Sequence, residues 1–136
     1  MRVFLDTNVL ASAFGARGLC SDVLRLVIEE HELIIGEVVL DELTNVLRRK
    51  FAVPHETISQ VESFLRQYEV EPLPVELPNL HLRDQNDLMV VGSALNAGAE
   101  IVVTGDGEML RLEDKPIRII SPREFWTLAG RRKNKR

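Results

Sequence analysis

The chain opens with Met1-Arg2-Val3-Phe4-Leu5-Asp6-Thr7-Asn8, an apolar run that stops at an acidic residue. A short apolar run that is bounded by polar residues is typical of a buried strand. The run begins at Met1, so we expect no leader sequence before it. The stretch therefore predicts a core strand with a carboxylate, that of Asp6, at its end.

The same construction recurs once, in Ile101-Val102-Val103-Thr104-Gly105-Asp106. If the two strands are parallel neighbours, Asp6 and Asp106 lie at the same edge of one sheet. In open α/β sheets, functional sites gather outside the carboxyl ends of the strands. We interpret this edge as the candidate site, although either Asp could instead cap a helix or form a turn.

Segments with helical and strand patterns alternate along the rest of the chain. Strands are expected near 32–35 and 117–120, and an edge strand is expected with the proline-containing segment that follows residue 68. Helices are expected near 8–14, 21–30, 37–50, 55–68, 88–97, 108–112 and 122–129. Thr7 or Asn8 is expected to cap the first helix, Ser21 the second, and a capping box at Ser121 the last. The alternation predicts an α/β fold, a three-layer α/β/α sandwich with a mainly parallel sheet.

The composition, 45% apolar and 28% charged over 136 residues, suits one ordinary globular domain. The longest nearly apolar stretch, Leu88 to Ala99, is too short to span a bilayer, and the single cysteine, Cys20, cannot form an internal disulfide. We therefore expect a cytoplasmic protein with no membrane attachment.

Charge is distributed unevenly along the chain. The net charge is -4, but five basic residues lie in the last six positions, so residues 1 to 130 hold 12 basic and 21 acidic residues, a net charge of -9. We expect a folded domain over 1–130 and a basic, disordered tail over 131–136. An acidic body argues against a broad surface for nucleic acid, yet it also fits carboxylates that are grouped around a cation.

Glu42 is the acidic residue of the 37–50 helix that is best placed to reach the sheet edge. At about 100° per residue, Glu42 falls on the flank of the apolar stripe near Leu43, whereas Asp41 points nearly opposite and Glu37 lies further round. The alternative for Glu42 is a half-exposed carboxylate without a function.

Two more acids precede the apolar helix, in Arg83-Asp84-Gln85-Asn86-Asp87. If Asp84 is the N-cap, Asp87 falls in the first turn, where the helix dipole favours an anion and no chemistry is required. However, this helix leads directly into the Asp106 strand, so its start is expected near the same sheet edge. We favour Asp87 as the functional acid of this segment, because it lies nearer the helix.

Carboxylates that are packed together repel one another unless a cation neutralises them. The three histidines, His31, His55 and His81, have no metal-binding spacing, and no cysteine is available as a partner ligand. An all-oxygen ligand set disfavours zinc and favours Mg²⁺ or Mn²⁺. Such a site suits the hydrolysis of phosphodiesters.

The motifs, in this order, resemble the PIN-domain family of nucleases over residues 1 to about 128. They are Leu5-Asp6-Thr7-Asn8-Val9-Leu10, Glu42, Arg83-Asp84-Gln85-Asn86-Asp87 and Val103-Thr104-Gly105-Asp106. The chain is similar above all to the toxins of toxin–antitoxin pairs that are related to the VapC ribonucleases. The resemblance implies a strand order of 3-2-1-4-5, a ribonuclease that depends on Mg²⁺ or Mn²⁺, frequent homodimers and, for toxin members, inhibition by a small antitoxin.

Carried over to this sequence, the resemblance implies roles for individual residues. The catalytic acids are Asp6, Glu42, Asp87 and Asp106, of which Asp6, Asp87 and Asp106 hold the metal; the supporting residues are Asn8, Thr104 and Asp84. Basic residues that could hold RNA phosphates are Arg48, Arg49 and Lys50 at a helix end and Arg131, Arg132 and Lys133 in the tail.

Two other functions are compatible with parts of this pattern. A phosphatase of the haloacid-dehalogenase type also begins with an Asp after the first strand, but it needs a second Asp two residues later, where this chain has Asn8. A module of the same fold could instead bind nucleic acid or protein without turnover. A missing acid would favour that module, and all four acids are present.

Overall fold

The computed structural model describes residues 1 to 130 of the chain. The predicted basic tail, with Arg131, Arg132 and Lys133, lies outside the described residues. The described part contains one five-stranded sheet, β1 Arg2–Leu5, β2 Glu32–Gly36, β3 Glu69–Glu71, β4 Ile101–Val103 and β5 Arg118–Ile120. All neighbouring strands are parallel, and their order is β3-β2-β1-β4-β5. The parallel sheet and its predicted strand order are confirmed.

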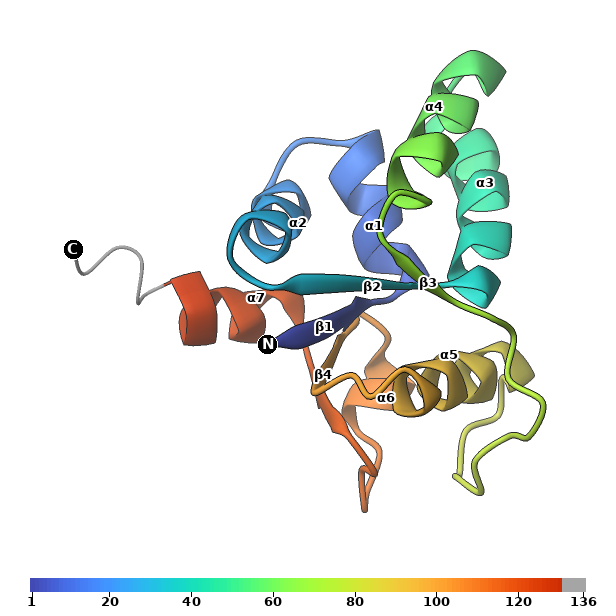
Figure 1. Ribbon diagram of the computed structural model, residues 1–136, viewed down its shortest axis with the longest axis vertical. Helices are drawn as coiled ribbons and strands as arrows, with labels where there is room; N and C mark the ends of the chain where they lie inside the picture. Colours follow the sequence, from blue (N-terminus) through green and yellow to red (C-terminus); the bar gives the residue numbers. More distant parts are fainter. Residues whose placement is uncertain (131–136) are drawn as a thin grey trace.

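Helices cover both faces of the sheet. They are α1 Thr7–Gly15, α2 Leu19–Glu30, α3 Glu37–Phe51, α4 His55–Leu65, α5 Gln85–Asn96, α6 Gly107–Leu110 and α7 Pro122–Phe125, followed by a π-helical turn, Trp126–Gly130. Figure 1 shows α1 to α4 on one side of β1 and β2, with α5 and α6 on the other. The three-layer α/β/α sandwich is therefore confirmed.

The central strand, β1, pairs with β2 on one side and with β4 on the other, and its last three residues are buried. Val3 is aligned with Leu33 of β2 and with Ile101 of β4. Val3, Phe4 and Leu5 are completely buried. A parallel strand that is covered on both faces requires a continuous apolar run, which is what the first residues of the chain supply. Asp6 is thereby carried to the centre of the carboxyl edge.

The start of α1 differs from the prediction. Asp6, and not Thr7 or Asn8, is the N-cap, since its carboxylate accepts a hydrogen bond from the Thr7 amide. The Asp carboxylate is as good a cap as a hydroxyl or an amide, and the strand ends one residue earlier than a Thr7 cap would require.

The second predicted cap is also wrong. Helix α2 begins at Leu19 with Gly18 as its N-cap, and Ser21 lies inside the first turn. The single hydrogen of the Ser21 hydroxyl is instead shared between the carbonyl oxygens of Ala13, at 2.9 Å, and Ala16, at 3.1 Å. Ser21 therefore ties the end of α1 to α2. The positive φ of Gly18, 152°, explains why a glycine stands at this turn.

Helix α4 is shorter than the predicted 55–68, because it ends at Leu65. Tyr68 has left the helix, and its ring packs edge-on against that of Phe64 at 5.5 Å between centroids. The chain must turn here to enter β3 at Glu69, which pairs with Ile34 of β2. The pairing of β3 with β2 therefore ends α4 earlier than the helical spacing of its apolar residues predicts.

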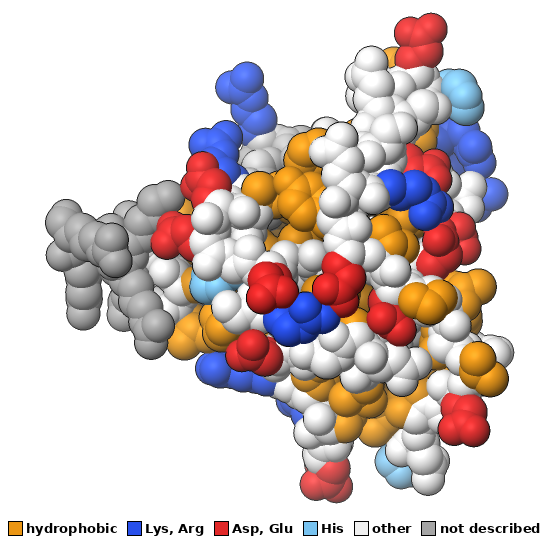
Figure 2. All heavy atoms as spheres, viewed as in Figure 1, with side chains coloured by type: hydrophobic (Ala, Val, Ile, Leu, Met, Phe, Trp, Pro, Cys, Tyr) orange, Lys and Arg blue, Asp and Glu red, His pale blue; other side chains and the backbone are white. Residues whose placement is uncertain are grey.

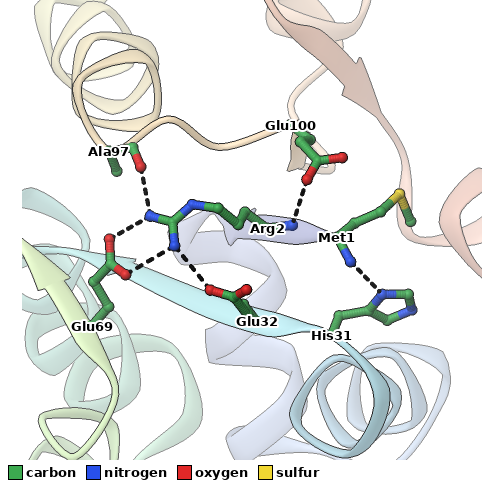
Figure 3. Close-up of polar contacts among 7 residues, drawn as sticks. All are labelled: Met1, Arg2, His31, Glu32, Glu69, Ala97 and Glu100. Atoms are coloured by element: carbon green, nitrogen blue, oxygen red, sulfur yellow. Dashed lines mark hydrogen bonds and ion pairs between the residues drawn. The ribbon is translucent and has the colours of Figure 1, made fainter.

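At the amino edge of the sheet, Arg2 joins several strands (Figure 3). Its guanidinium donates hydrogen bonds to Glu32 at 2.9 Å, to Glu69 at 2.6 and 3.1 Å, and to the carbonyl of Ala97 at 2.6 Å. The Arg2 amide donates to Glu100. Arg2 therefore links β1 to β2, to β3 and to the turn before β4, at the edge opposite Asp6.

The surface mixes both signs of charge. In the face that Figure 2 shows, acidic and basic side chains are interspersed, and hydrophobic side chains gather over α5 and the loop before it. None of the helices in residues 1 to 130 is long and apolar enough to cross a bilayer.

Candidate active site

A cleft of about 270 Å³ opens at the carboxyl edge of the sheet, where β1 and β4 end. Five carboxylates line it. They are Asp6 after β1, Glu42 on α3, Asp84 and Asp87 at the start of α5, and Asp106 after β4. Residues that are up to 100 positions apart in the sequence therefore share one cleft, because the parallel strands deliver their ends to the same edge.

Asp6 is the most buried of the five acids, with 4% of its surface exposed. Burial raises the pKa of Asp6, and the charge of Asp106 raises it further. Hydrogen bonds from the Thr104 hydroxyl, at 2.7 Å, and from the Thr7 amide, also at 2.7 Å, oppose this rise. Asp6 is thus a preorganised carboxylate that is held at low solvent exposure.

Thr104 connects the ends of the two central strands. Its hydroxyl donates to Asp6 and accepts a hydrogen bond from the Asp106 amide at 3.0 Å. Asn8 lies beside it, with its side-chain amide 3.3 Å from the Thr104 hydroxyl and its Oδ1 accepting from the Gly105 amide at 2.8 Å. Asn8 therefore has a structural role between β1 and β4, in the place where the phosphatase alternative needs a second acid.

Glu42 faces the cleft, as its place on the helix flank predicts. The Asn86 side chain donates a 2.7 Å hydrogen bond to Glu42 Oε2 and so joins α3 to the first turn of α5. Burial raises the pKa of Glu42, the charge of Asp6 adds to the rise, and the charge of Lys50 lowers it. The other acids of α3 are elsewhere, since Asp41 is exposed and Glu37 pairs with Arg66 at 2.7 Å.

Asp84 and Asp87 have different surroundings. Asp84 is exposed, and it caps α5 by accepting a hydrogen bond from the Asn86 amide at 2.9 Å. Asp87 is half-buried, and no residue that the structure describes donates a hydrogen bond to its side chain. Burial, followed by the charges of Asp106 and Asp84, raises the pKa of Asp87 from 3.8 to about 7. The choice of Asp87 as the functional acid stays a prediction, and its lack of a structural hydrogen bond favours it.

Asp106 combines a structural contact with a place in the cleft. Its carboxylate caps α6 by accepting a hydrogen bond from the Met109 amide at 3.0 Å. One oxygen, Oδ2, is used in this cap. The capping role that the sequence allowed for Asp106 is therefore real, and it orients the carboxylate rather than removing it from the cleft.

The donor chemistry of the cleft fits a divalent cation that prefers oxygen. Of the described residues, no His or Cys lines the cleft, and carboxylates are the ligands of Mg²⁺ and Mn²⁺. Within residues 1 to 130, no three His, Cys, Asp or Glu side chains converge into a ready-made metal-binding group. The raised pKa values of Asp6, Glu42 and Asp87 show uncompensated repulsion and burial. A bound cation would offset the cost of burying these carboxylates and the repulsion among them.

The three basic residues at the end of α3 separate in the structure. Lys50 lines the cleft, whereas Arg48 and Arg49 do not. The Arg48 guanidinium donates instead to Asn45 at 2.9 Å. Among these three predicted RNA contacts, only Lys50 lines the same cleft as the acids.

Sequence reasoning missed Asn86 and Phe51. Asn86 stands between the two acids of its segment, and its spacing alone gives no sign that it holds a glutamate 44 positions earlier. Phe51, which lines the cleft at the end of α3, lies just beyond the predicted helix of residues 37–50 and carries no signal in the sequence besides being apolar. The contacts of Asn86 and Phe51 can be recognised only when the relative position of two packed helices is known.

Comparison with solved structures shows where this architecture occurs. VapBC2 from Rickettsia felis, bound to a DNA fragment from their promoter, matches with a TM-score of 0.64 and 19% identity, over 89% of this chain and 98% of that chain. DNA-bound VapBC from Salmonella typhimurium matches with a TM-score of 0.64 and 22% identity, over 90% and 98% of the two chains. At these identities the likeness concerns the fold. A search of curated proteins gave no significant match.

The family model for the PIN domain matches residues 2 to 108. This span runs from β1 to the start of α6 and includes all five acids of the cleft. The fold, the strand order and the family match agree, and the chain belongs to the PIN-domain family of nucleases.

Proposed function

We propose that this chain is a divalent-metal-dependent endoribonuclease. The observation that carries the proposal is the cleft itself, which Asp6, Glu42, Asp87 and Asp106 line from four separate elements. Burial and mutual repulsion raise the pKa values of Asp6, Glu42 and Asp87, so this grouping costs the folded state stability at neutral pH. Perturbed carboxylates in one cleft are a mark of a functional site.

The residues of the cleft have distinct roles in this proposal. Asp6, Asp87 and Asp106 would hold Mg²⁺ or Mn²⁺, which when bound activates a water molecule and stabilises the leaving oxygen of the phosphodiester. Glu42, whose pKa is raised by burial, would accept a proton from the attacking water. Asn86 keeps the Glu42 carboxylate turned toward the cleft, and Thr104 and Asn8 keep Asp6 in place.

The proposal extends to partners. The similarity in fold to VapBC complexes supports a toxin role, in which a small antitoxin protein binds this chain. We further propose that the chain acts in the cytoplasm and forms a homodimer. A neighbouring reading frame for a small protein, followed by co-purification of the two proteins and measurement of the mass of the complex, would test these points.

Cleavage of RNA tests the nuclease directly. The purified chain is incubated with single-stranded RNA, structured RNA and single-stranded DNA, in Mg²⁺, in Mn²⁺ or in excess chelator. We expect cleavage of RNA in either metal and none with chelator, and loss of cleavage by Asp6→Asn. The matched control is Asp41→Asn, which changes an exposed acid on the far side of α3. Cleavage that persists in chelator would rule out the mechanism, and metal-independent RNA binding without cleavage would favour a binding module.

A further inference from the structure

The cleft extends beyond the acids, along the groove between α1 and α3. Helix α3 contributes Glu42, Val46 and Lys50, which are spaced by four residues and so share one face of the helix. Phe51 follows Lys50 and also lines the cleft. At 1.5 Å per residue, Lys50 stands about 12 Å along the helix from Glu42. The cleft therefore has an acidic end at the sheet and a second end, formed by Lys50 and Phe51, near the last turn of α3.

Lys50 is the one cationic side chain among the described residues that line the cleft, against five carboxylates. No carboxylate within residues 1 to 130 forms a salt bridge with it. Its charge nevertheless lowers the pKa of Glu42, so it acts inside the cleft. A single divalent ion would leave this cleft with a net negative charge, and an approaching phosphodiester would still be repelled. Lys50 offers the local positive charge that such a substrate needs.

Phe51 follows Lys50 and packs closely against Gly15 of α1. A methyl group at Gly15 of α1 would lie 2.4 Å from Cδ1 of the Phe51 ring, so the ring rests directly on the glycine backbone. Helix α3 ends at Phe51, and its C-cap, Ala52, has a left-handed conformation with φ of 51°. The Val53 amide closes the turn by donating to the Leu47 carbonyl at 3.1 Å. The ring is half-buried, with part of it at the cleft surface.

We propose that Lys50 and Phe51 form a nucleotide-binding subsite for single-stranded RNA. Lys50 contacts the phosphate that neighbours the cleaved one, and the Phe51 ring stacks on the adjoining base. The subsite rests on the proposed function, because it requires that RNA is the substrate cleaved at the carboxylates of the acidic end. A cation and an aromatic ring in one groove are the pair that binds a single strand without sequence preference, since every base has a face to stack.

Each residue also has a purely structural explanation. A lysine in the last turn of a helix interacts favourably with the helix dipole, and a phenylalanine on a glycine can serve packing alone. These structural explanations predict that substitutions change the stability of the protein. They predict no change in RNA binding that depends on the phosphates or bases of the RNA. Binding measurements on RNA with and without bases therefore separate the two.

The first measurement concerns Lys50. Binding of a fluorescently labelled single-stranded RNA is followed by anisotropy over a range of salt concentrations, with Ca²⁺ in place of Mg²⁺ and the RNA checked for integrity. We expect Lys50→Met to weaken binding about tenfold and to lower the slope of log affinity against log salt by about 0.7. The control Arg118→Met removes an equal charge at the start of β5, at the opposite edge of the sheet. We expect it to change neither quantity.

The second measurement concerns Phe51. We expect Phe51→Leu to weaken binding about fivefold or more without changing the salt slope, and Phe51→Tyr to retain binding, because the ring remains. On an RNA that lacks bases, Phe51→Leu and the unaltered chain should bind equally. Phe64→Leu, which removes an exposed aromatic ring of α4 outside the cleft, is the control. Thermal denaturation of every variant verifies that it folds.

The outcomes are distinct. If Lys50→Met binds like Arg118→Met, or if Phe51→Leu binds like the unaltered chain, the subsite is wrong, whether or not Mg²⁺-dependent cleavage occurs. If binding depends on both residues but no RNA is cleaved in Mg²⁺ or Mn²⁺, the subsite stands and the proposed nuclease fails. If the unaltered chain binds no RNA, both proposals are overturned.

Discussion

The Thr104 hydroxyl donates a 2.7 Å hydrogen bond to Oδ2 of Asp6, a residue 98 positions earlier in the chain. Thr104 is completely buried and Asp6 is 4% exposed, so water cannot replace this bond. The same hydroxyl accepts from the Asp106 amide. One side chain thus connects the carboxyl ends of β1 and β4 and sets the positions of two acids of the cleft.

Replacement of this hydroxyl should lower stability. Thr104→Val keeps the shape of the side chain but removes the shortest hydrogen bond to Oδ2 of the buried Asp6 carboxylate and leaves the Asp106 amide without its acceptor. We expect the free energy of unfolding to fall by about 1–3 kcal/mol. Thr104→Ser, which keeps the hydroxyl, should lose less. Chemical denaturation measures both, and a valine variant as stable as the unaltered chain would contradict the role assigned to this bond.

The raised pKa of Asp87 predicts how the metal-free protein responds to pH. Between pH about 4 and about 7 the folded state keeps a proton at Asp87 that the unfolded chain has released. The contribution of Asp87 to stability is therefore present at low pH, is lost as the pH rises through about 7, and changes little above that. Asp87→Asn should raise the free energy of unfolding at pH 8 by about 1 kcal/mol, allowing for solvent screening in an open cleft.

This prediction is measured by denaturation at a series of pH values in chelator. The difference between Asp87→Asn and the unaltered chain should shrink toward pH 4. A difference that is constant over the whole range would show that Asp87 titrates normally.

Alanine substitutions should separate the two acids of α5. Asp84→Ala removes the N-cap of the helix and should cost about 1 kcal/mol of stability with a modest effect on cleavage. Asp87→Ala should reduce the cleavage rate by orders of magnitude without lowering the stability of the metal-free protein. Melting temperatures and single-turnover rates give both quantities. The opposite pattern, with Asp84 essential for cleavage, would exchange the roles of these residues.

Affinity for Mg²⁺ should depend on pH, because a cation and a proton compete for Asp87. With a pKa of about 7, the ionised fraction of Asp87 falls about tenfold between pH 8 and pH 6. The apparent affinity should fall by at least the same factor, as measured by isothermal titration calorimetry. In Asp87→Asn this pH dependence should be reduced, and an unaltered dependence would show that other groups are responsible.

Arg2 offers a test at the opposite edge. Arg2→Met breaks the contacts to Glu32 and Glu69 that join three strands, so the melting temperature should fall. The rate of RNA cleavage at saturating substrate and at a temperature well below melting should stay unchanged, because the cleft is at the other end of the strands. Loss of activity in a folded Arg2→Met variant would mean that strain at this edge reaches the acids.

The sequence by itself determined the layout of the fold. The apolar runs that end at Asp6 and Asp106 are local signals of buried parallel strands, and the alternation of strand and helix leads to helices on both faces. Glu42 was found by its place on the helix flank, which is again a matter of local geometry. Where two local signals competed, as at Tyr68, the position of the next strand decided the helix end.

Only the tertiary structure decided which polar groups meet. Arg48, Arg49 and Lys50 are consecutive basic residues that the sequence alone does not distinguish. Successive helix residues point about 100° apart, and of these three only Lys50 lines the cleft between α1 and α3. The hydrogen bond from Asn86 to Glu42 joins two helices through residues 44 positions apart. The position of the Phe51 ring requires that residue 15 is a glycine, without a side chain. Such contacts require the relative positions of packed helices, which no periodicity in the sequence encodes.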